Sequence, residues 1–573
     1  MNSVPDKTDS WEVASLEYTI GDFLARHSPE EDRDAVRKLG LALARTTIEG
    51  GSHLSSEGVR EQIGDRDPSA LHAVGSAEGS EPLVLLGDGT LYLRRYFEYE
   101  QTLAASITQR VGQSPRPPTG SSGAGLGENI SDCLDPGQQM AVGCASLRQF
   151  CMITGGPGTG KTRTIVGLLA FLLKNDPDLK VALAAPTGKA AFRMRDSILN
   201  SLPALNLPGD LHERVLACSK ASTIHRLLGS IRGSVDFRRN GKNPLRHDLI
   251  IIDEASMVDL PLMAKLLSAL RPETRVVLTG DADQLSPVQG GPVFNALARD
   301  FSPDRFAQQD VDALKELSLS AINNATSDDI LAGCHVSLKH SHRQEGSAAA
   351  AISRLCQSIR EGDADTALSI LREDAGEGRL SWVENLDSST ADEAIRTGYG
   401  PFRVAVEPAQ SLEAFSRFRI LCAINLGRFG VQDWNSRAAN LIQSKDPADG
   451  AEPIVITSNE YAVGLFNGDD GILRGNRAWF RGEEDLREVA LSRLPRYLPA
   501  YATTIHRSQG SEYDKVLVIL PPEESRILTR ELLYVAVSRA RSGVLLVGAE
   551  NSLRAAINNS EPSTSGVPAL LRK

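Results

Sequence analysis

The chain has few cysteines for its length and no long apolar run. Its 573 residues include seven cysteines, none of them in a C-x-x-C pair. This scarcity argues against a zinc or iron–sulfur cluster and fits a reducing compartment. The N-terminal segment has neither a basic region nor an apolar core, so we expect no secretory signal. The longest apolar run is too short to span a bilayer. The composition predicts a soluble, cytoplasmic protein with no membrane partner.

An excess of positive charge is also missing. The formal net charge is −11, so any surface that binds nucleic acid must be local. Apolar residues make up 41% and charged residues 24% of the chain, as in ordinary globular proteins. The length predicts several domains.

The pattern of apolar runs divides the chain. Residues 1–112 have mostly helical patterning and precede a segment rich in Gly, Ser and Pro, which we interpret as a flexible linker over 113–133. Short apolar strands then alternate with helices, which predicts two α/β domains with parallel sheets, over 134–335 and 336–573. Asn-Gly pairs predict a β-hairpin insertion at about 229–247 and a second β insertion at about 450–500.

The segment GGPGTGKT fits the phosphate-binding pattern G-x-x-x-x-G-K-[ST] and lies between a predicted strand, 150–154, and a predicted helix, 163–173. Its glycines let backbone N–H groups close around phosphate oxygens at a helix N-terminus. Lys161 is expected to reach the β- and γ-phosphates of ATP, and Thr162 to ligate Mg²⁺. The predicted nucleotide-binding residues here are Gly155, Gly156, Pro157, Gly158, Thr159, Gly160, Lys161, Thr162 and the adjoining Arg163.

Two later strands end in polar residues that complete this chemistry. In IIIDEAS, Asp253 is expected to hold Mg²⁺ and Glu254 to activate the attacking water. In VVLTGDADQL, the amide of Gln284 can hydrogen-bond the γ-phosphate and respond to its loss.

The ordered series GGPGTGKT, AAPTGKAA, IIDEAS, GDADQL, SHR, TTIHRSQGSEYD and YVAVSRAR resembles the motifs of superfamily 1 helicases. Within them the chain is similar to the 5′→3′ branch and, in that branch, to the RecD family. The segments LYLRRYFEYEQTLA and GRFGVQDWN strengthen the likeness, which runs from about residue 80 to the end. The resemblance implies two RecA-like motor domains, an SH3-like form for the second β insertion, and a partner-docking N-terminal domain.

The resemblance also assigns further residues. Gln138 matches the adenine-reading glutamine, with Gln139 as a less favoured register. Arg343 and Arg539 match arginines that grip the γ-phosphate from the second motor domain, in the manner of arginine fingers. Glu512 matches a residue close to the ribose.

Contacts to single-stranded DNA are implied for six residues in three segments: Thr187 and Lys189, Thr223 and His225, and Thr504 and His506. For each of them alone, a helix cap or another satisfied polar group is the competing interpretation. The predicted hairpin carries five basic residues, which favours a DNA-facing role over a solvated hairpin: Arg232, Arg238, Arg239, Lys242 and Arg246.

The expected activity is ATP-dependent 5′→3′ translocation and unwinding of DNA, with RecB-like and RecC-like subunits as partners in double-strand break repair and recombination. Exonuclease activity is implied only for the whole complex. Two alternatives remain open, a stand-alone 5′→3′ helicase and a nucleotide-binding scaffold without motor activity. Stand-alone relatives usually carry a longer N-terminal region than the roughly 130 residues before this motor.

Overall fold

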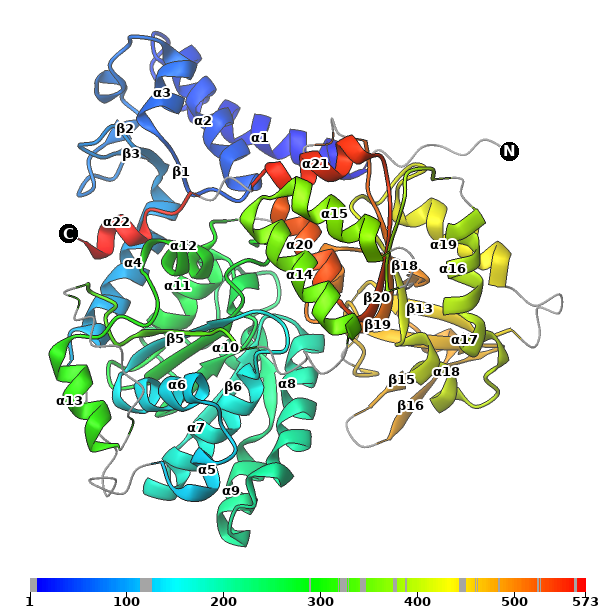
Figure 1. Cartoon of the computed structure of the whole chain (residues 1–573). Helices are drawn as coiled ribbons and strands as arrows, with labels where there is room; N and C mark the ends of the chain where they lie inside the picture. The colour runs from blue at the N-terminus through cyan, green and yellow to red at the C-terminus, as the bar shows by residue number, and fades with distance from the viewer. Residues whose placement is uncertain are drawn as a thin grey trace.

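The computed structural model describes residues 8–113, 126–287, 290–317, 319, 327, 329–340, 347–374, 379–386, 389–442, 450–458, 460, 462–482, 485–522, 525, 527–560 and 564–572. These residues form an N-terminal domain and two domains built on parallel sheets (Figure 1). Within them, no helix has both the length and the apolar character needed to cross a membrane.

The N-terminal domain packs three helices against a small sheet of order β1-β4-β3-β2. Its elements are α1 (Thr8–Arg26), α2 (Arg33–Ile48), β1 (His53–Leu54), α3 (Ser56–Ile63), β2 (Val74–Gly75), β3 (Leu83–Leu85) and β4 (Leu91–Leu93). Helix α4 (Arg94–Val111) leaves this domain and lies against the first parallel-sheet domain, where Leu103 and Ile107 share a hydrophobic cluster with Phe150 and Ile250. Helix α4 therefore anchors the N-terminal domain to the first parallel-sheet domain.

The first parallel sheet has six strands in the order β10-β5-β9-β8-β6-β7. They are β5 (Phe150–Gly155), β6 (Val181–Ala185), β7 (Ala221–Thr223), β8 (Leu249–Ile252), β9 (Arg275–Gly280) and β10 (His335–Leu338). The helices of this domain are α5 (Glu128–Ser131), α6 (Pro136–Leu147), α7 (Lys161–Asn175), α8 (Gly188–Ser201), α9 (Gly209–Cys218), α10 (Ile224–Leu228), α11 (Leu260–Ser268), α12 (Val293–Asp300) and α13 (Gln308–Glu316).

Burial explains which of these strands the sequence reveals. The central strands β5 and β8 are buried along their whole length and read as continuous apolar runs, as expected for parallel strands covered on both faces. The edge strands β7 and β10 are short and contain polar residues, so no apolar run marks them. Because β10 pairs with β5 from His335 to Leu338, the first sheet extends past the expected boundary at residue 335.

The second parallel sheet has the order β11-β20-β19-β12-β18. Its strands are β11 (Leu380–Val383), β12 (Phe418–Cys422), β18 (Ala502–Thr504), β19 (Tyr513–Ile519) and β20 (Ala540–Val547). Its helices are α14 (Ser347–Glu361), α15 (Ala364–Asp374), α16 (Ser389–Gly398), α17 (Gly400–Val404), α18 (Pro408–Phe415), α19 (Val431–Ile442), α20 (Arg530–Ser538) and α21 (Glu550–Asn558). The expected α/β architecture with two parallel sheets is confirmed.

The two predicted β insertions differ in outcome. A five-stranded antiparallel sheet, β16-β15-β14-β13-β17, lies within the second domain. It comprises β13 (Glu452–Ile456), β14 (Asp470–Arg474), β15 (Arg477–Arg481), β16 (Leu486–Ala490) and β17 (Tyr497–Pro499). Residues 229–247, in contrast, form no regular ladder and are closed by isolated antiparallel bridges, Ser230 to Phe237 and Asn240 to Asn243, and by single backbone hydrogen bonds. A lone two-stranded ribbon that packs few apolar residues is marginally stable, which explains the difference.

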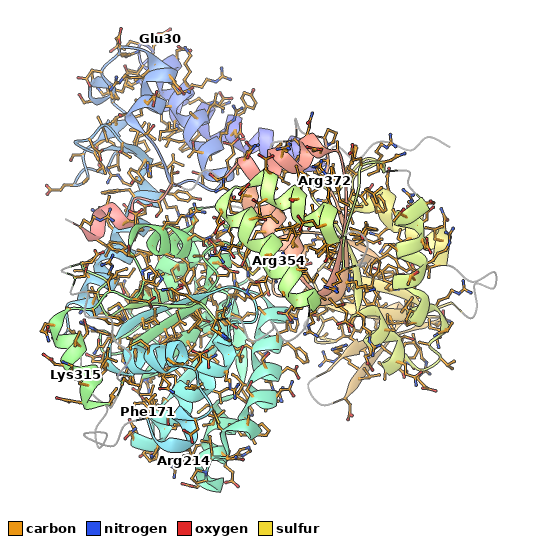
Figure 2. The ribbon with its side chains drawn as sticks, in the orientation of Figure 1. Glu30, Phe171, Arg214, Lys315, Arg354 and Arg372 are labelled. Carbon is orange, nitrogen blue, oxygen red and sulfur yellow. The ribbon has the colours of Figure 1, made fainter. Side chains whose placement is uncertain are left out.

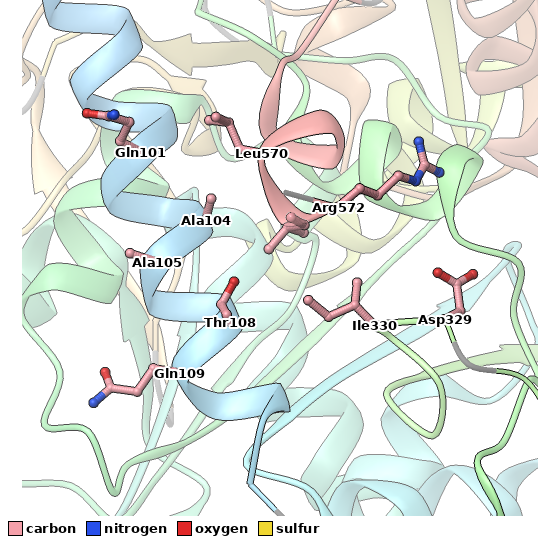
Figure 3. A pocket seen from close by; sticks show the side chains of 10 residues that line it. Gln101, Ala104, Ala105, Thr108, Gln109, Asp329, Ile330, Leu570 and Arg572 are labelled. Atoms are coloured by element: carbon pink, nitrogen blue, oxygen red, sulfur yellow. The ribbon is translucent and has the colours of Figure 1, made fainter. Parts of the chain in front are cut away.

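The end of the chain returns to its beginning. Helix α22 (Val567–Leu571) lies beside α4, although α21 belongs to the second domain (Figure 1). The fully buried Glu100 on α4 accepts hydrogen bonds from Gly566 N at 2.8 Å and from Ser565 Oγ at 3.3 Å. Residues 564–572, the C-terminal tail, thus fasten to the N-terminal half of the molecule. An open groove of ≈ 1190 Å³ runs between α4, the tail and Ile330 (Figure 3).

Charge and apolar packing are segregated as in other globular domains. Phe171 on α7 lies within the first domain's core, whereas Arg214 on α9 and Lys315 on α13 lie at its periphery (Figure 2). The apolar core on both faces of the first sheet holds the carboxyl ends of its strands in fixed positions, and the glycine loop, Asp253, Glu254 and Gln284 follow those ends.

Candidate functional site

The strand order separates two groups of predicted residues. The glycine loop follows β5, Gln284 follows β9 and Asp253 follows β8, so the residues with nucleotide chemistry follow three adjacent strands. Thr187 follows β6, and Thr223 ends the edge strand β7. The sheet therefore sets the proposed DNA residues beside, and not among, the residues of the nucleotide site.

Two glycines of the predicted phosphate loop have left-handed backbone. Gly158 and Gly160 have φ of +82° and +79°, in the left-handed region that favours glycine. Lys161 Nζ donates to the carbonyl oxygens of Gly155 at 2.6 Å and Gly156 at 3.2 Å, which places its ammonium group inside the loop. Gly160 is the N-cap of α7 and brings no side chain to cover the first N–H groups of that helix. The loop and the helix terminus together fit an anionic phosphate chain.

The side chain of Gln138 contacts the glycine loop. Its side chain is fully buried and completes a capping box with Asp135 at the start of α6. Its Nε2 donates to the carbonyl oxygen of Thr159 at 3.2 Å. Gln139, the alternative register, donates instead to Ser131 and Leu134. Of the two, Gln138 is the one that touches the glycine loop.

The two acidic residues after β8, Asp253 and Glu254, have different surroundings. Asp253 Oδ1 accepts from Thr279 Oγ1 at 2.6 Å, which fixes one oxygen of the carboxylate. Glu254 has φ of +52°, an uncommon conformation for a residue with a side chain. Its Oε2 is buried, and no group in the described part of the chain bonds it. Burial, with the neighbouring charge of Asp253, raises the pKa of Glu254, as expected for a general base.

The loop 281–286 after β9 connects the two parallel-sheet domains, and we call it the bridging loop. Asp281 Oδ2 accepts from Gln284 Nε2 at 3.2 Å and from Tyr534 Oη, on α20 of the second domain, at 3.0 Å. Leu285 is buried in the hydrophobic cluster of the second domain, and its carbonyl oxygen accepts from Gln509. The bridging loop thus belongs to the first domain by its position in the chain, but its side chains and backbone contact the second domain.

The second domain brings one described arginine, Arg539, to this site. Arg539, at the end of α20, is 3% exposed and donates to the carbonyl oxygens of Val535 and Ser511. Its charge, with those of Lys161 and Arg193, opposes the rise in the pKa of Glu254. Arg539 therefore acts electrostatically on the proposed base from the opposite domain. Arg343 lies outside the described residues.

Glu512 takes part in an ion-pair network between the domains. Its Oε2 lies 3.1 Å from Arg541 Nη2 and 3.8 Å from Nη2 of Arg193 on α8. Arg193 also donates to the carbonyl oxygen of Gly510 at 2.5 Å. Glu512 thus contacts arginines of both domains, and its role toward a ribose stays a prediction.

The proposed DNA residues include three helix or turn caps. The hydroxyls of Thr187, Thr223 and Thr504 accept from backbone N–H groups three residues later. His225 is exposed beside Phe237, and burial lowers the pKa of the partly covered His506. The three backbone hydrogen bonds explain why a hydroxyl side chain occurs at Thr187, Thr223 and Thr504 without invoking a ligand.

Lys189 forms an ion pair across the domains. Its Nζ lies 2.8 Å from Asp470 Oδ2 on β14, the same oxygen that Arg419 approaches at 3.4 Å. Although burial opposes it, Lys189 and Arg419 hold the pKa of Asp470 below its ordinary value. Lys189, a predicted contact to DNA, is therefore held by a carboxylate of the second domain.

Several residues of this site escaped sequence reasoning. Asp281 and Tyr534 lie inside the segments GDADQL and YVAVSRAR, whose pattern drew attention to Gln284 and Arg539 instead. Arg193 and Asp470 carry no sequence signal, because their partners are 317 and 281 residues away.

Lys161 of the first domain and Arg539 of the second both act on Glu254, so the site draws on both parallel-sheet domains. This arrangement is that of an ATP-dependent DNA helicase of superfamily 1. Two family matches agree, an AAA domain over residues 138–290 and a UvrD-like helicase C-terminal domain over residues 499–547.

Relatives specify the family. The chain is 35% identical to "RecBCD enzyme subunit RecD" of Mycolicibacterium smegmatis, over 95% of each chain. It is 32% identical to the protein of the same name in Haemophilus influenzae, over 76% of this chain and 72% of that one. It is 29% identical to "ATP-dependent RecD2 DNA helicase" of Deinococcus radiodurans, over 81% of this chain and 56% of the relative. The chain belongs to the RecD family.

Proposed function

We propose that the chain moves 5′→3′ along single-stranded DNA and unwinds duplexes, as the RecD-type subunit of a complex with RecB-like and RecC-like partners. The observation that carries the motor assignment is the bridging loop, where Gln284 of one domain and Tyr534 of the other share one oxygen of Asp281. Such a shared contact suits a motor whose domains respond together to one nucleotide. The complex would act in double-strand break repair and recombination.

The site's own residues suggest a division of labour. Lys161 would hold the β- and γ-phosphates of ATP, and Thr162 and Asp253 would hold Mg²⁺. Glu254 Oε2 would accept the proton of the attacking water, because it is buried without a described partner and its pKa is raised. Arg539 would offset negative charge that develops on the phosphates. Hydrolysis of ATP supplies the free energy for movement.

Lys161→Gln tests the nucleotide assignment. The change removes the ammonium group that the glycine loop surrounds, so DNA-stimulated ATP hydrolysis should fall by at least about 100-fold. Lys174→Gln, at the exposed end of the same helix, is the matched control and should retain activity. Unchanged hydrolysis in Lys161→Gln would remove the basis of the assignment.

Unwinding by the isolated chain tests direction and partnership. Duplexes with a 5′ tail should be unwound in preference to duplexes with a 3′ tail, and the preference should persist when RecB-like and RecC-like partners are added. A 3′ preference would contradict the polarity. Full activity without partners would favour the stand-alone alternative over an obligate subunit.

A further inference from the structure

We propose that Tyr534 is a positioning residue that transmits the state of the glycine loop and Gln284 to the second domain through Asp281. The proposal rests on the proposed function, because it concerns how ATP hydrolysis is coupled to movement. It assigns a task to a side chain that lies inside the segment YVAVSRAR but was not among the predicted site residues.

Tyr534 crosses the domain boundary and lies between the bridging loop and the glycine loop. It lies on α20, is 2% exposed, and donates from Oη to Asp281 Oδ2 at 3.0 Å. A Cβ atom at Gly156 would lie 3.2 Å from the same hydroxyl oxygen, so the tyrosine also borders the glycine loop. The hydroxyl group thus bonds to Asp281 and lies close to the glycine loop.

The shared oxygen makes the contact responsive. Gln284 Nε2 and Tyr534 Oη donate to the same Oδ2, while Oδ1 is engaged by the N–H of Asp283. If the amide of Gln284 turns toward a phosphate, Asp281 loses one donor and its bond to Tyr534 strengthens or moves. Asp281 is 1% exposed, so water cannot readily replace the missing donor.

Helix α20 carries the response onward. Arg539 follows the last turn of α20, five residues after Tyr534, and its guanidinium donates to the carbonyl oxygen of Ser511. A shift of Tyr534 would therefore move Arg539, whose charge acts on Glu254, and the segment 510–512, which Arg193 of α8 contacts. Nucleotide state would reach the DNA-binding segments along this route.

Tyr534→Phe removes the hydroxyl and keeps the ring. Tyr399→Phe is the matched control, because Tyr399 is also buried in the second domain and also loses one hydrogen bond, to the carbonyl oxygen of Tyr501. The measured quantity is the number of base pairs unwound per ATP hydrolysed, with the melting temperature of each variant. We expect that number to fall by about three- to tenfold in Tyr534→Phe, the loss of one buried hydrogen bond, and to hold in Tyr399→Phe.

Hydrogen exchange gives a readout that needs no unwinding. In the wild type, a non-hydrolysable ATP analogue should change the protection of backbone amides from exchange in both the bridging loop and α20. In Tyr534→Phe, the analogue should change this protection only in the bridging loop. An unchanged unwinding ratio with an intact response of α20, or equal losses in both variants, would overturn the proposal. A wild type that binds the analogue but unwinds nothing would contradict the proposed function, while the exchange experiment would still decide the role of Tyr534.

Discussion

Glu254 combines three properties that seldom occur together by chance. Its backbone is in the left-handed region, its Oε2 is buried without a described partner, and its pKa is raised by burial and by Asp253. Left-handed backbone in a residue with a side chain costs about 1–2 kcal/mol, so the surrounding fold must impose it. The strained backbone places the carboxylate of Glu254 in the proposed site.

The raised pKa of Glu254 predicts the pH dependence of ATP hydrolysis. A general base acts only when ionised, so kcat should fall as the pH drops through the raised pKa, with an acid limb above the ordinary glutamate value of about 4.3. Glu254→Gln should lower kcat by about 10²–10⁴ and leave nucleotide binding in place. A pH–rate profile that stays flat down to the ordinary glutamate range would contradict the assignment.

At the scale of elements, the C-terminal tail is held by apolar packing of Val567 and Leu571 and by hydrogen bonds of its backbone to Glu100 and Ser52. Gly566 lies against Tyr92 and Glu100, and a Cβ atom there would lie only 2.0 Å from the hydroxyl oxygen of Tyr92. The close approach lets Gly566 N reach Glu100 Oε1, which joins the end of the chain to α4. Glycine is required here by space.

Gly566→Ala should therefore release the tail. We expect faster proteolysis and faster hydrogen exchange over 564–572, with a loss of about 1–3 kcal/mol in the free energy of unfolding. Gly209→Ala is the control, because its Cβ would meet nothing within 4 Å. Equal protection of the tail in Gly566→Ala and the wild type would show that Glu100 does not hold it.

At the scale of the whole molecule, pairs of charged residues join the two parallel-sheet domains around the bridging loop. Arg299 on α12 pairs with Glu531 at 3.2 Å, and Arg360 on α14 pairs with Asp283 at 2.9 Å. Farther out, Lys189 pairs with Asp470. If nucleotide binding moves the two domains relative to each other, these contacts should rearrange together, because they connect the same two bodies.

The pair of Lys189 and Asp470 predicts opposite effects on DNA binding. If Lys189 binds a phosphate of the strand, Lys189→Ala should weaken binding to all sequences and reduce the slope of log K against log salt by about 1. Asp470→Asn should strengthen binding, because it frees Lys189 from a competing carboxylate. Titration of a labelled oligonucleotide at several salt concentrations measures both. Weaker binding in both variants would mean that the pair serves only to hold the domains.

The sequence by itself determined the parallel-sheet architecture, the glycine loop and the acidic pair. Continuous apolar runs mark β5 and β8 because those strands are buried on both faces, and the loop chemistry needs residues that are consecutive in the chain. It did not reveal the edge strands β7 and β10, whose short, partly polar sequences resemble loops.

Only the tertiary structure decided how distant residues meet. It turned Lys189 toward Asp470, set Tyr534 beside Gly156 and brought the C-terminal tail back to Glu100. Each of these contacts joins segments hundreds of residues apart, and each depends on the packing of whole domains rather than on local pattern. Hydrogen bonds and ion pairs of this kind have no period along the chain, so no reading of the sequence could have supplied them.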